Sequence, residues 1–318
     1  MKTVVVGGGS WGTAFSRILA SLRHEVTLAC RDPEQARAIE ESHRNPRYLT
    51  QVDLTGIHAT TVEEAPVAAA ELVVVAVPSA AFGSVVEALP GQAPVLSLTK
   101  GLDPASGERL STLVRDRPVA VLSGPNIAEE IARGLPAAAV IASEDQELAL
   151  DLQRAINSIV FRVYVNDDLV GVELCAAAKN VIALAAGGAD GLRLGDNAKA
   201  AIVARGLAEM SRLAEAAGGK PETFAGLAGI GDLAVTCWAA TGRNRRAGEL
   251  IAQGTDPAEA VRQIGMVVEG LTTAPVLRDL SHRLKIELPI TEGVCSVLSG
   301  TSLQELVAGL MSRVPTQE

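Results

Sequence analysis

A short aliphatic run followed at once by a glycine-rich turn constrains the fold of this chain more than any other feature. Val4–Val6 leads directly into Gly7–Gly12, whose sequence GGGSWG satisfies the pattern GxGxxG, and a helical periodicity follows. In such a strand–turn–helix unit Gly7 makes the tight turn, Gly9 lets the backbone approach a pyrophosphate, and Gly12 lets the helix pack closely. The free N–H groups at the helix N-terminus then bind the phosphates. These flanks favour a dinucleotide-binding unit over the alternative, an ordinary glycine-rich turn.

The first half of the chain repeats this alternation of strand and helix. Aliphatic runs predict buried strands at Thr3–Val6, Val26–Ala29, Leu72–Val77, Val95–Leu98, Val119–Leu122 and Ala138–Ile141. Helical patterns lie between them at Trp11–Leu22, Pro33–Glu41 and Ile127–Arg133. Aromatic residues are only 3% of the chain, so the core is aliphatic, as in parallel strands that are covered on both faces. We therefore expect a Rossmann-type, doubly wound parallel sheet with helices, an α/β fold.

After about Asp168 the pattern becomes helical. Helices are predicted at Leu169–Ala186, Asn197–Ala217, Arg245–Gln253, Asp256–Gly265, Thr273–Leu284 and Ser302–Met311. Asp196 is a suitable N-cap for the second of these helices, and the glycine-rich segment 187–199 is expected to be a polar connection. Since 318 residues suit two domains, we predict a dinucleotide-binding domain at 1–168 and an all-helical domain at 169–318, with the ligand in the cleft between them.

Composition limits the classes of partner. A net charge of -9 argues against a general nucleic-acid binder but is compatible with an anionic small molecule. The four cysteines have no metal-ligand spacing, so we expect buried, reduced thiols and no metal. The apolar runs are too short for a signal peptide or a membrane span, which predicts a cytoplasmic protein. A homodimer is compatible with the sequence, which does not specify the oligomeric state.

The end of the second predicted strand bears on the choice of dinucleotide. Arg31 and Asp32 follow that strand in this order. An acidic residue at this position binds the ribose 2′-hydroxyl of NAD, whereas arginine accommodates the 2′-phosphate of NADP. Because the arginine comes first, we expect NADP(H) to be preferred and NAD(H) to be usable.

Lys179 is the best candidate for a general acid or base. None of the four histidines has a suggestive setting. On a helix, the residues three and four positions from Lys179 are small and apolar: Cys175, Ala176, Ile182 and Ala183. Burial among them would lower the pKa of the lysine toward the neutral range, where proton transfer is efficient. The alternative is a lysine that extends its charged end to solvent from an amphipathic helix.

Several other polar clusters are suited to a phosphate. Arg243–Arg246 has the sequence RNRR at a predicted helix start, where arginine side chains and free N–H groups can act together. For Arg245 and Arg246 taken separately, we favour a solvated basic helix end. Lys100 follows a predicted strand, at the edge where parallel sheets bind ligands. The glycine-rich segment Gly226–Asp232 is a further candidate.

Motifs along nearly the whole chain resemble the bacterial glycerol-3-phosphate dehydrogenase family. They are Gly7–Gly12 (GGGSWG), Ser97–Leu102 (SLTKGL), Ser123–Ala128 (SGPNIA), Lys179–Val181 (KNV), Asp190–Arg212, Thr223–Cys237 (TFAGLAGIGDLAVTC), Gly242–Arg246 (GRNRR) and Val268–Gly270 (VEG). The resemblance implies reversible, NAD(P)-dependent reduction of dihydroxyacetone phosphate to sn-glycerol 3-phosphate, a precursor of phospholipids, with Lys179 as the proton donor.

The resemblance also assigns the remaining roles by position. It implies cofactor contacts from Ser10, Trp11, Arg31, Lys100, Ala128, Arg243, Val267 and Glu269, besides the glycine loop. It implies substrate contacts from Lys100, Gly124, Asn126, Lys179, Asp232, Gly242, Arg243 and Asn244.

The chain departs from the family pattern next to the predicted phosphate site. Gly242 stands where the family commonly has a small hydroxyl residue, and Cys237–Ala240 replaces a stretch richer in Thr and Ser. The hydroxyl hydrogen bond is therefore lost, although the Gly242 N–H could replace it. Two alternatives remain open: a dehydrogenase of similar build that acts on a 2-hydroxy or 3-hydroxy acid, and a dinucleotide-binding regulator without turnover.

Overall fold

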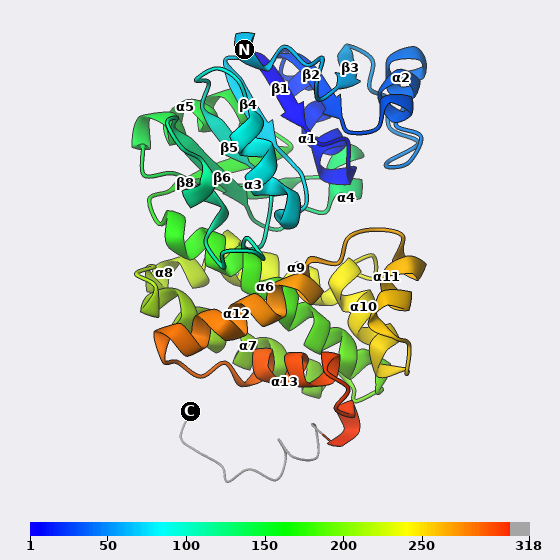
Figure 1. Ribbon diagram of the computed structural model, residues 1–318, viewed down its shortest axis with the longest axis vertical. Coiled ribbons are helices and arrows are strands. Elements are labelled where there is room, and N and C mark those ends of the chain that lie inside the picture. Colours follow the sequence, from blue (N-terminus) through cyan, green and yellow to red (C-terminus); the bar gives the residue numbers. More distant parts are fainter. Residues whose placement is uncertain (306–318) are drawn as a thin grey trace.

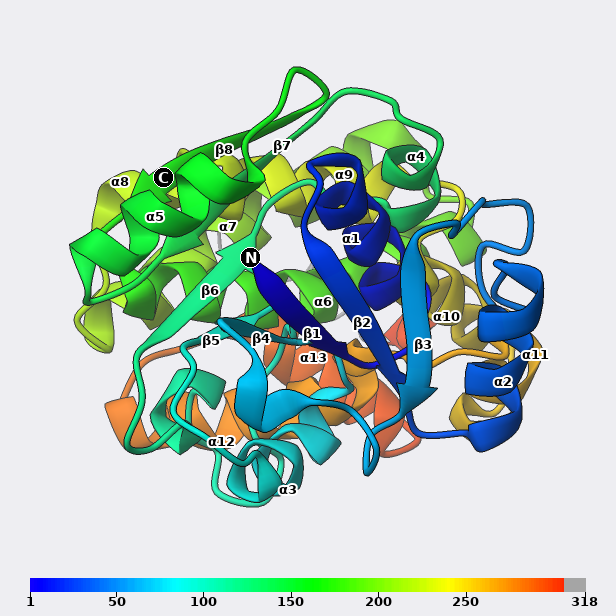
Figure 2. The same ribbon diagram turned by 90° about the horizontal axis from the view of Figure 1, so that it is seen from above.

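A computed structural model describes residues 1–305 of the chain, as a sheet region above a helical region (Figure 1). The strands are β1 (Lys2–Val6), β2 (Glu25–Cys30), β3 (Ile57–Thr61), β4 (Leu72–Val75), β5 (Val95–Ser97), β6 (Val119–Ser123), β7 (Ala137–Ala142) and β8 (Phe161–Asn166). They form one sheet in the order β3-β2-β1-β4-β5-β6-β7-β8. The chain thus winds outward from β1 in both directions, which confirms the predicted doubly wound, Rossmann-like sheet (Figure 2).

Helices cover both faces of this sheet. They are α1 (Ser10–Ser21), α2 (Pro33–Ser42), α3 (Ser79–Ala88), α4 (Ala128–Ala132) and α5 (Gln146–Ile156), with short 3-10 turns at Val67–Ala69 and Leu110–Leu113. In β1, Val5 packs into the cluster that contains Phe15 of α1, whereas Val4 and Val6 pack on the opposite face with Phe82 of α3. Both faces of the strand are therefore buried, which is why its sequence is an uninterrupted aliphatic run.

Three features of the sheet differ from the sequence prediction. β3 and β8 were not predicted, because they are the edge strands and alternate exposed and buried side chains instead of forming an aliphatic run. The sheet is also not wholly parallel, since β7 runs antiparallel to β6. After β6 the chain passes through α4, which packs beside α1, and turns back into β7 without crossing to the other end of the sheet.

The helical region is built around α6 (Leu169–Gly191), which lies below the sheet and is buried along most of its length (Figure 1). Around it are α7 (Asp196–Ala216), α8 (Pro221–Phe224), a π-helical turn at Leu227–Gly231, α9 (Asp232–Trp238), α10 (Arg243–Ala252), α11 (Pro257–Ile264), α12 (Glu269–Leu284) and α13 (Pro289–Leu298). By length and composition α6 could cross a membrane, but 89% of its apolar window is buried inside the protein. The bent pair formed by Pro221–Trp238 and Arg243–Ala252 meets the same criteria only if it is counted as one span.

Several predicted helix boundaries in this region are wrong. α12 begins at Glu269 and not at Thr273. α6 does not end at Ala186 but continues through Gly187 and Gly188 to Gly191. These glycines permit a close helix contact: a Cβ on Gly187 would lie 1.8 Å from the carbonyl oxygen of Arg245 in α10. The N-cap of α7 is Gly195, with φ of 82°, and not Asp196, which occupies the first turn instead. The helix predicted at Ser302–Met311 extends beyond the described residues.

Candidate active site

The carboxyl ends of the central strands face the helical region, and the candidate site residues meet there. Ser79 follows β4, Lys100 follows β5 and Gly124 follows β6. Each contacts the helical region or a side chain that does: Ser79 binds Glu269 and Lys100 binds both Asp232 and the Gly124 carbonyl. Ligands of open α/β sheets bind at this edge, so the arrangement fits a site between the sheet and the helices.

The glycine loop has the geometry that a pyrophosphate requires. Gly7 has φ of 122°, and a Cβ there would lie 2.4 Å from the Ala76 carbonyl oxygen. A Cβ on Gly12 would lie 1.9 Å from the Gly7 carbonyl oxygen, so α1 can sit this close to the turn only with glycine. Beside Gly9, by contrast, there is open space. No side chain caps α1, which leaves the first N–H groups of that helix free for an anion.

The side chain of Trp11, a predicted cofactor contact, packs against other aromatic rings of the sheet region. Its ring lies 5.6 Å from that of Phe15 and 6.4 Å from that of Phe161, measured between centroids. Its indole N–H is buried and has no partner among the described residues. Ser10 begins α1 and is half-buried beside it. The backbone of both residues therefore lies at the phosphate-binding end of the helix.

Two residues that the sequence analysis did not single out hold the glycine loop in place. The Asn45 side chain is fully buried and donates to the Gly8 carbonyl at 3.0 Å and to Thr13 Oγ1 at 2.9 Å. The Gln35 amide donates to the same Gly8 carbonyl at 2.7 Å. The Asn45 oxygen in turn accepts from the N–H of Arg47 and of Tyr48. The Asn45-Pro46 dipeptide, a loop signal, was the one available clue.

Asp32 is already engaged at the position where the ribose of a dinucleotide is read. Its side chain caps α2 by accepting from the Glu34 N–H at 2.9 Å, and it forms an ion pair with Arg47. The Glu34 N–H, followed by the Arg47 guanidinium, lowers the pKa of this carboxyl and keeps it ionised. Arg31, directly after β2, is exposed. An exposed arginine therefore precedes an aspartate that is already paired, an arrangement compatible with a phosphorylated ribose.

The centre of the site is a buried cluster of two lysines and one aspartate. Lys179, from the middle of α6, donates to Asp232 Oδ1 at 2.5 Å and to Thr236 Oγ1 at 2.9 Å. Lys100 donates to the other oxygen of Asp232 at 2.7 Å. Asp232 is the first residue of α9 and only 1% exposed. One carboxylate thus joins lysines from the sheet region and the helical region, and Thr236 is a contact that the sequence analysis missed.

Burial brings the pKa of Lys179 into the neutral range. Loss of solvent, opposed in part by the Asp232 carboxylate and assisted by repulsion from Lys100, lowers the pKa of Lys179 from 10.5 to about 7. The two lysines together hold the pKa of Asp232 below its usual value in spite of burial. The alternative of an exposed, solvated lysine does not apply, because the side chain is only 6% exposed. A buried amine of this pKa can exchange a proton at neutral pH.

The turn after β6 offers further polar groups beside this cluster. Gly124 has φ of 132°, and its carbonyl accepts from Lys100 at 3.1 Å. Both polar atoms of the Asn126 side chain are buried and have no partner among the described residues. A buried amide without partners is costly, so Asn126 is a candidate to bind a polar ligand. Ala128, two residues later, begins α4 and is buried.

The start of α10 carries the predicted phosphate-binding residues. Gly242 is the N-cap, and no side chain caps the helix, so its first-turn N–H groups are free. The Gly242 N–H itself donates to the Ala239 carbonyl at 3.0 Å and is not free to replace the missing hydroxyl, which corrects the expectation from the sequence. The Asn244 amide joins α6 to α12, through Asn180 Oδ1 and the Gly270 N–H, both at 2.9 Å.

Arg245 is not the solvated helix end that we expected, whereas Arg246 is. The Arg245 side chain is 13% exposed and forms an ion pair with Asp190 at 2.6 Å. The Arg246 side chain is 54% exposed and pairs with Glu249 on the helix surface. Arg243 is exposed and donates to the Val267 carbonyl at 3.1 Å.

Glu269 links the start of α12 to the sheet. Its carboxyl accepts from the Ser79 hydroxyl at 2.6 Å and from the Ser79 N–H at 3.2 Å. Burial raises the pKa of this carboxyl. Val267, two residues earlier, is 43% exposed. Glu269 thus lies beside the carboxyl end of β4, the edge at which sheets of this kind bind a dinucleotide.

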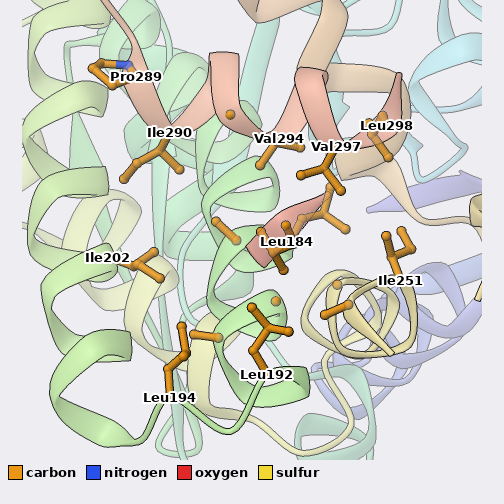
Figure 3. A pocket seen from close by; sticks show the side chains of 17 residues that line it. Leu184, Leu192, Leu194, Ile202, Ile251, Pro289, Ile290, Val294, Val297 and Leu298 are labelled. Atoms are coloured by element: carbon orange, nitrogen blue, oxygen red, sulfur yellow. The ribbon is translucent and has the colours of Figure 1, made fainter. Parts of the chain in front are cut away.

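An apolar cavity lies away from this cluster. It has a volume of about 100 Å³ and lies between α6, α7, α10 and α13, where Leu184, Ile202, Ile251 and Val294 line it (Figure 3). Its walls are aliphatic and carry no group for proton transfer or phosphate binding. In the part of the chain that the structure describes, no three His, Cys, Asp or Glu residues are placed to hold a metal, and all four cysteines are buried and unpaired.

Comparisons with known proteins agree in both halves of the chain. Residues 2–149 match the family model described as NAD-dependent glycerol-3-phosphate dehydrogenase N-terminus, and residues 168–308 match its C-terminus. A Moorella thermoacetica protein named glycerol-3-phosphate dehydrogenase [NAD(P)+] is 47% identical over 99% of this chain and 96% of its own. A Thermoanaerobacter protein of the same name is 45% identical over 98% of this chain and 97% of its own.

Similarity to a solved structure is equally extensive. The crystal structure of glycerol-3-phosphate dehydrogenase from Coxiella burnetii aligns with a TM-score of 0.94 and 36% identity, and covers 98% of this chain and 99% of its own. The agreement includes both the sheet region and the helical region.

Proposed function

The chain belongs to the NAD-dependent glycerol-3-phosphate dehydrogenase family, and from this premise we propose that it reduces dihydroxyacetone phosphate reversibly to sn-glycerol 3-phosphate with NADPH or NADH. The observation that carries the proposal is the buried Lys179, whose pKa near 7 suits proton transfer to a ketone oxygen. The product would supply phospholipid synthesis.

Lys179 acts as the proton donor in the reduction. Of the three N–H bonds of its ammonium group, one is directed to Asp232 and one to Thr236, which leaves one for the carbonyl oxygen of the substrate. NADPH or NADH, when bound, would supply the hydride that the ketone carbon receives. As negative charge develops on the oxygen, Lys179 stabilises it and transfers its proton, and neutral Lys179 accepts a proton in the reverse reaction.

The neighbouring residues orient the substrate around Lys179. Asp232 and Lys100 hold the lysine in position, and Asn126 offers its unpartnered amide to the substrate hydroxyl or carbonyl. At the other end, the free N–H groups of α10 and the side chains of Arg243 and Asn244 hold the phosphate. Anchoring the phosphate away from the reacting carbon fixes the direction of the carbonyl.

The glycine loop and the residues after β2 and β4 hold the dinucleotide. The N-terminus of α1 would hold the pyrophosphate, and Arg31 would contact the adenosine ribose. Because Asp32 is paired with Arg47, we favour NADP(H) over NAD(H). Ser10, Trp11, Lys100, Ala128, Arg243, Val267 and Glu269 complete the predicted contacts, within a nucleotide-binding domain of residues 1–168 and a catalytic domain of residues 169–318.

The proposal includes a cytoplasmic homodimer. Four unpaired, buried cysteines suit a reducing compartment. A dimer is supported by exposed apolar residues near the free edge strand β8, among them Ile159 and Val160. Light scattering after size-exclusion chromatography tests this part: a mass of 32.9 kDa, that of one chain, would contradict the dimer.

The reaction itself is tested by the oxidation of NADPH and NADH with dihydroxyacetone phosphate. Rapid oxidation of either cofactor, absent without substrate, is the expected result. The ratio of kcat/KM for the two cofactors then measures the preference attributed to Arg31. Protein that binds both cofactors but oxidises neither with this substrate would contradict the proposal, and activity on a hydroxy acid instead would identify another dehydrogenase.

A further inference from the structure

Arg245 binds the backbone of residues 239–242, the connection between α9 and α10. Its Nε donates to the Ala239 carbonyl at 3.1 Å, and its Nη2 donates to the Ala240 carbonyl at 3.3 Å. Its Nη1 donates to Asp190, near the end of α6, at 2.6 Å. One guanidinium group therefore ties two successive carbonyls of a surface connection to the central helix.

A second cation supports the same anchor. Asp190 also accepts from Lys199 of α7 at 2.7 Å, and Lys199 is only 7% exposed. The Lys199 ammonium lies 5.5 Å from the ring centre of Trp238, the last residue of α9. Burial tends to raise the pKa of Asp190, but Lys199 and Arg245 together hold it below the ordinary value. The end of α9 and the start of α10 are thus both attached to one ionised carboxylate.

The geometry of the peptide groups gives this anchor a consequence for ligand binding. All peptide bonds in the described chain are trans, and in a planar trans peptide the N–H points opposite to the C=O. The carbonyls of Ala239 and Ala240 point toward Arg245, so the N–H groups of Ala240 and Thr241 point away from it. Among residues 1–305 neither N–H has a hydrogen-bond partner.

The same connection determines where α10 begins. The Ala239 carbonyl that binds Arg245 also accepts the Gly242 N–H, and α10 starts at the next residue, with its first-turn N–H groups uncapped. The connection also lies against the catalytic cluster, because a Cβ on Gly242 would approach the carbonyl oxygen of Thr236 to 3.0 Å, and Thr236 binds Lys179. Gly242 itself offers no hydroxyl that could orient a ligand.

We propose that Arg245, anchored by Asp190 and Lys199, is a positioning residue for the substrate phosphate: it holds the connection 239–242 so that the start of α10 presents its free N–H groups and Arg243 to that phosphate. Arg245 acts through the backbone and does not itself contact the substrate. The inference rests on the proposed reduction of dihydroxyacetone phosphate, and it explains how the site retains an oriented anion-binding turn without the hydroxyl that Gly242 lacks.

Arg246 provides a matched control for the test. It is the adjacent arginine on the same helix and also pairs with Glu249. Its guanidinium is exposed, however, and within residues 1–305 it forms no hydrogen bond or ion pair with the connection. We expect Arg245→Ala to raise the KM for dihydroxyacetone phosphate by about tenfold or more, because the charged phosphate loses hydrogen bonds from the displaced backbone. The value of kcat should fall less than about threefold. Arg246→Ala is expected to leave both constants unchanged.

A substrate without phosphate distinguishes positioning from general damage. Dihydroxyacetone makes no phosphate contacts, so Arg245→Ala and the wild type should reduce it with equal kcat/KM. A loss of similar size on both substrates would show that Arg245 merely maintains the fold and would overturn the inference. Equal KM values for dihydroxyacetone phosphate in Arg245→Ala and the wild type would also overturn it.

Two further variants keep the result interpretable. Arg245→Lys can still pair with Asp190 but cannot bind two carbonyls as a fork, so it should restore the KM only in part. Asp190→Asn removes the anchor and should raise the same KM, again with dihydroxyacetone reduction unchanged. If the wild type does not reduce dihydroxyacetone phosphate at all, the proposed function fails, an outcome separate from failure of the Arg245 inference.

Discussion

At the scale of the single residue, Lys179 has an ordinary sequence context and an unusual environment. It follows a run of alanines in α6, and nothing next to it along the chain is charged except Glu173, six residues earlier. In the folded protein its ammonium lies against Asp232 and near Lys100, and burial lowers its pKa to about 7.

The first prediction concerns pH. Reduction needs Lys179 protonated, so kcat for ketone reduction is expected to fall as the pH rises through about 7, whereas oxidation of sn-glycerol 3-phosphate needs the neutral amine and should rise through the same range. Initial rates in both directions across neutral pH measure this. Asp232 raises the pKa of Lys179, so Asp232→Asn should move both profiles to lower pH; profiles that are parallel in the two directions would contradict the assignment.

The second prediction concerns removal of the amine. Lys179→Met keeps the apolar part of the side chain and should lower kcat by about 10²- to 10⁴-fold, the usual contribution of a general acid. The dissociation constant of NADPH, measured by fluorescence, should change little. Lys220→Met, at an exposed lysine paired with Asp167, is the matched control and should have normal kinetics. Normal turnover in Lys179→Met would remove this residue from the mechanism.

At the scale of the helix and strand, glycines have two different meanings that the sequence does not distinguish. The segment with Gly187, Gly188 and Gly191 has the composition of a turn, and we predicted a connection there. In the structure it is the last turn of α6, against which α10 packs with its own Gly248. The glycines allow backbone to meet backbone, a reason that becomes visible only when both helices are in place.

This contact gives the third prediction. A Cβ on Gly187 would lie 1.8 Å from the backbone oxygen of Arg245, so Gly187→Ala must separate the helices and should cost about 3 kcal/mol of stability in spite of the better helix propensity of alanine. Gly188→Ala is the matched control, because its Cβ would meet only the movable Leu303 side chain, at 3.1 Å. Urea unfolding measures both, and equal stabilities would contradict the account.

At the scale of the whole molecule, ion pairs and hydrogen bonds join the sheet region to the helical region. Glu173 of α6 is buried and pairs with Arg109, which precedes the 3-10 turn Leu110–Leu113. Ser111 donates its N–H and its hydroxyl to the same carboxyl. Together with the Lys100–Asp232 and Ser79–Glu269 contacts, these bonds keep the two walls of the active site in register.

The fourth prediction tests this junction. Arg109→Ala leaves the Glu173 carboxylate buried without its cation, and because Arg109 is 23% exposed we expect a loss of about 2 kcal/mol, less than for a fully buried pair. Burial raises the pKa of Glu173 and Arg109 opposes this, so the variant should recover some stability at acidic pH, where the carboxyl is protonated. Arg115→Ala, at an exposed arginine nearby, should have no effect on urea unfolding.

The sequence by itself determined the features that depend on neighbours along the chain. The strand–glycine loop–helix unit, the buried aliphatic strands and the division into α/β and helical halves are local patterns, because the periodicity of burial is imprinted within each element. Lys179 was identified in the same way, from the small apolar residues one helical turn away. The edge strands β3 and β8 escaped because alternating burial is a weaker signal over a few residues.

Only the tertiary structure decided which distant residues act together. Lys100, Lys179 and Asp232 come from three separate segments. One carboxylate oxygen of Asp232 binds Lys100, and the other binds Lys179. The support of the glycine loop by Asn45 and the anchoring of 239–242 by Arg245 likewise depend on contacts between elements. Such contacts leave no periodic trace in the sequence, since a hydrogen bond between two side chains specifies a distance in space and none along the chain.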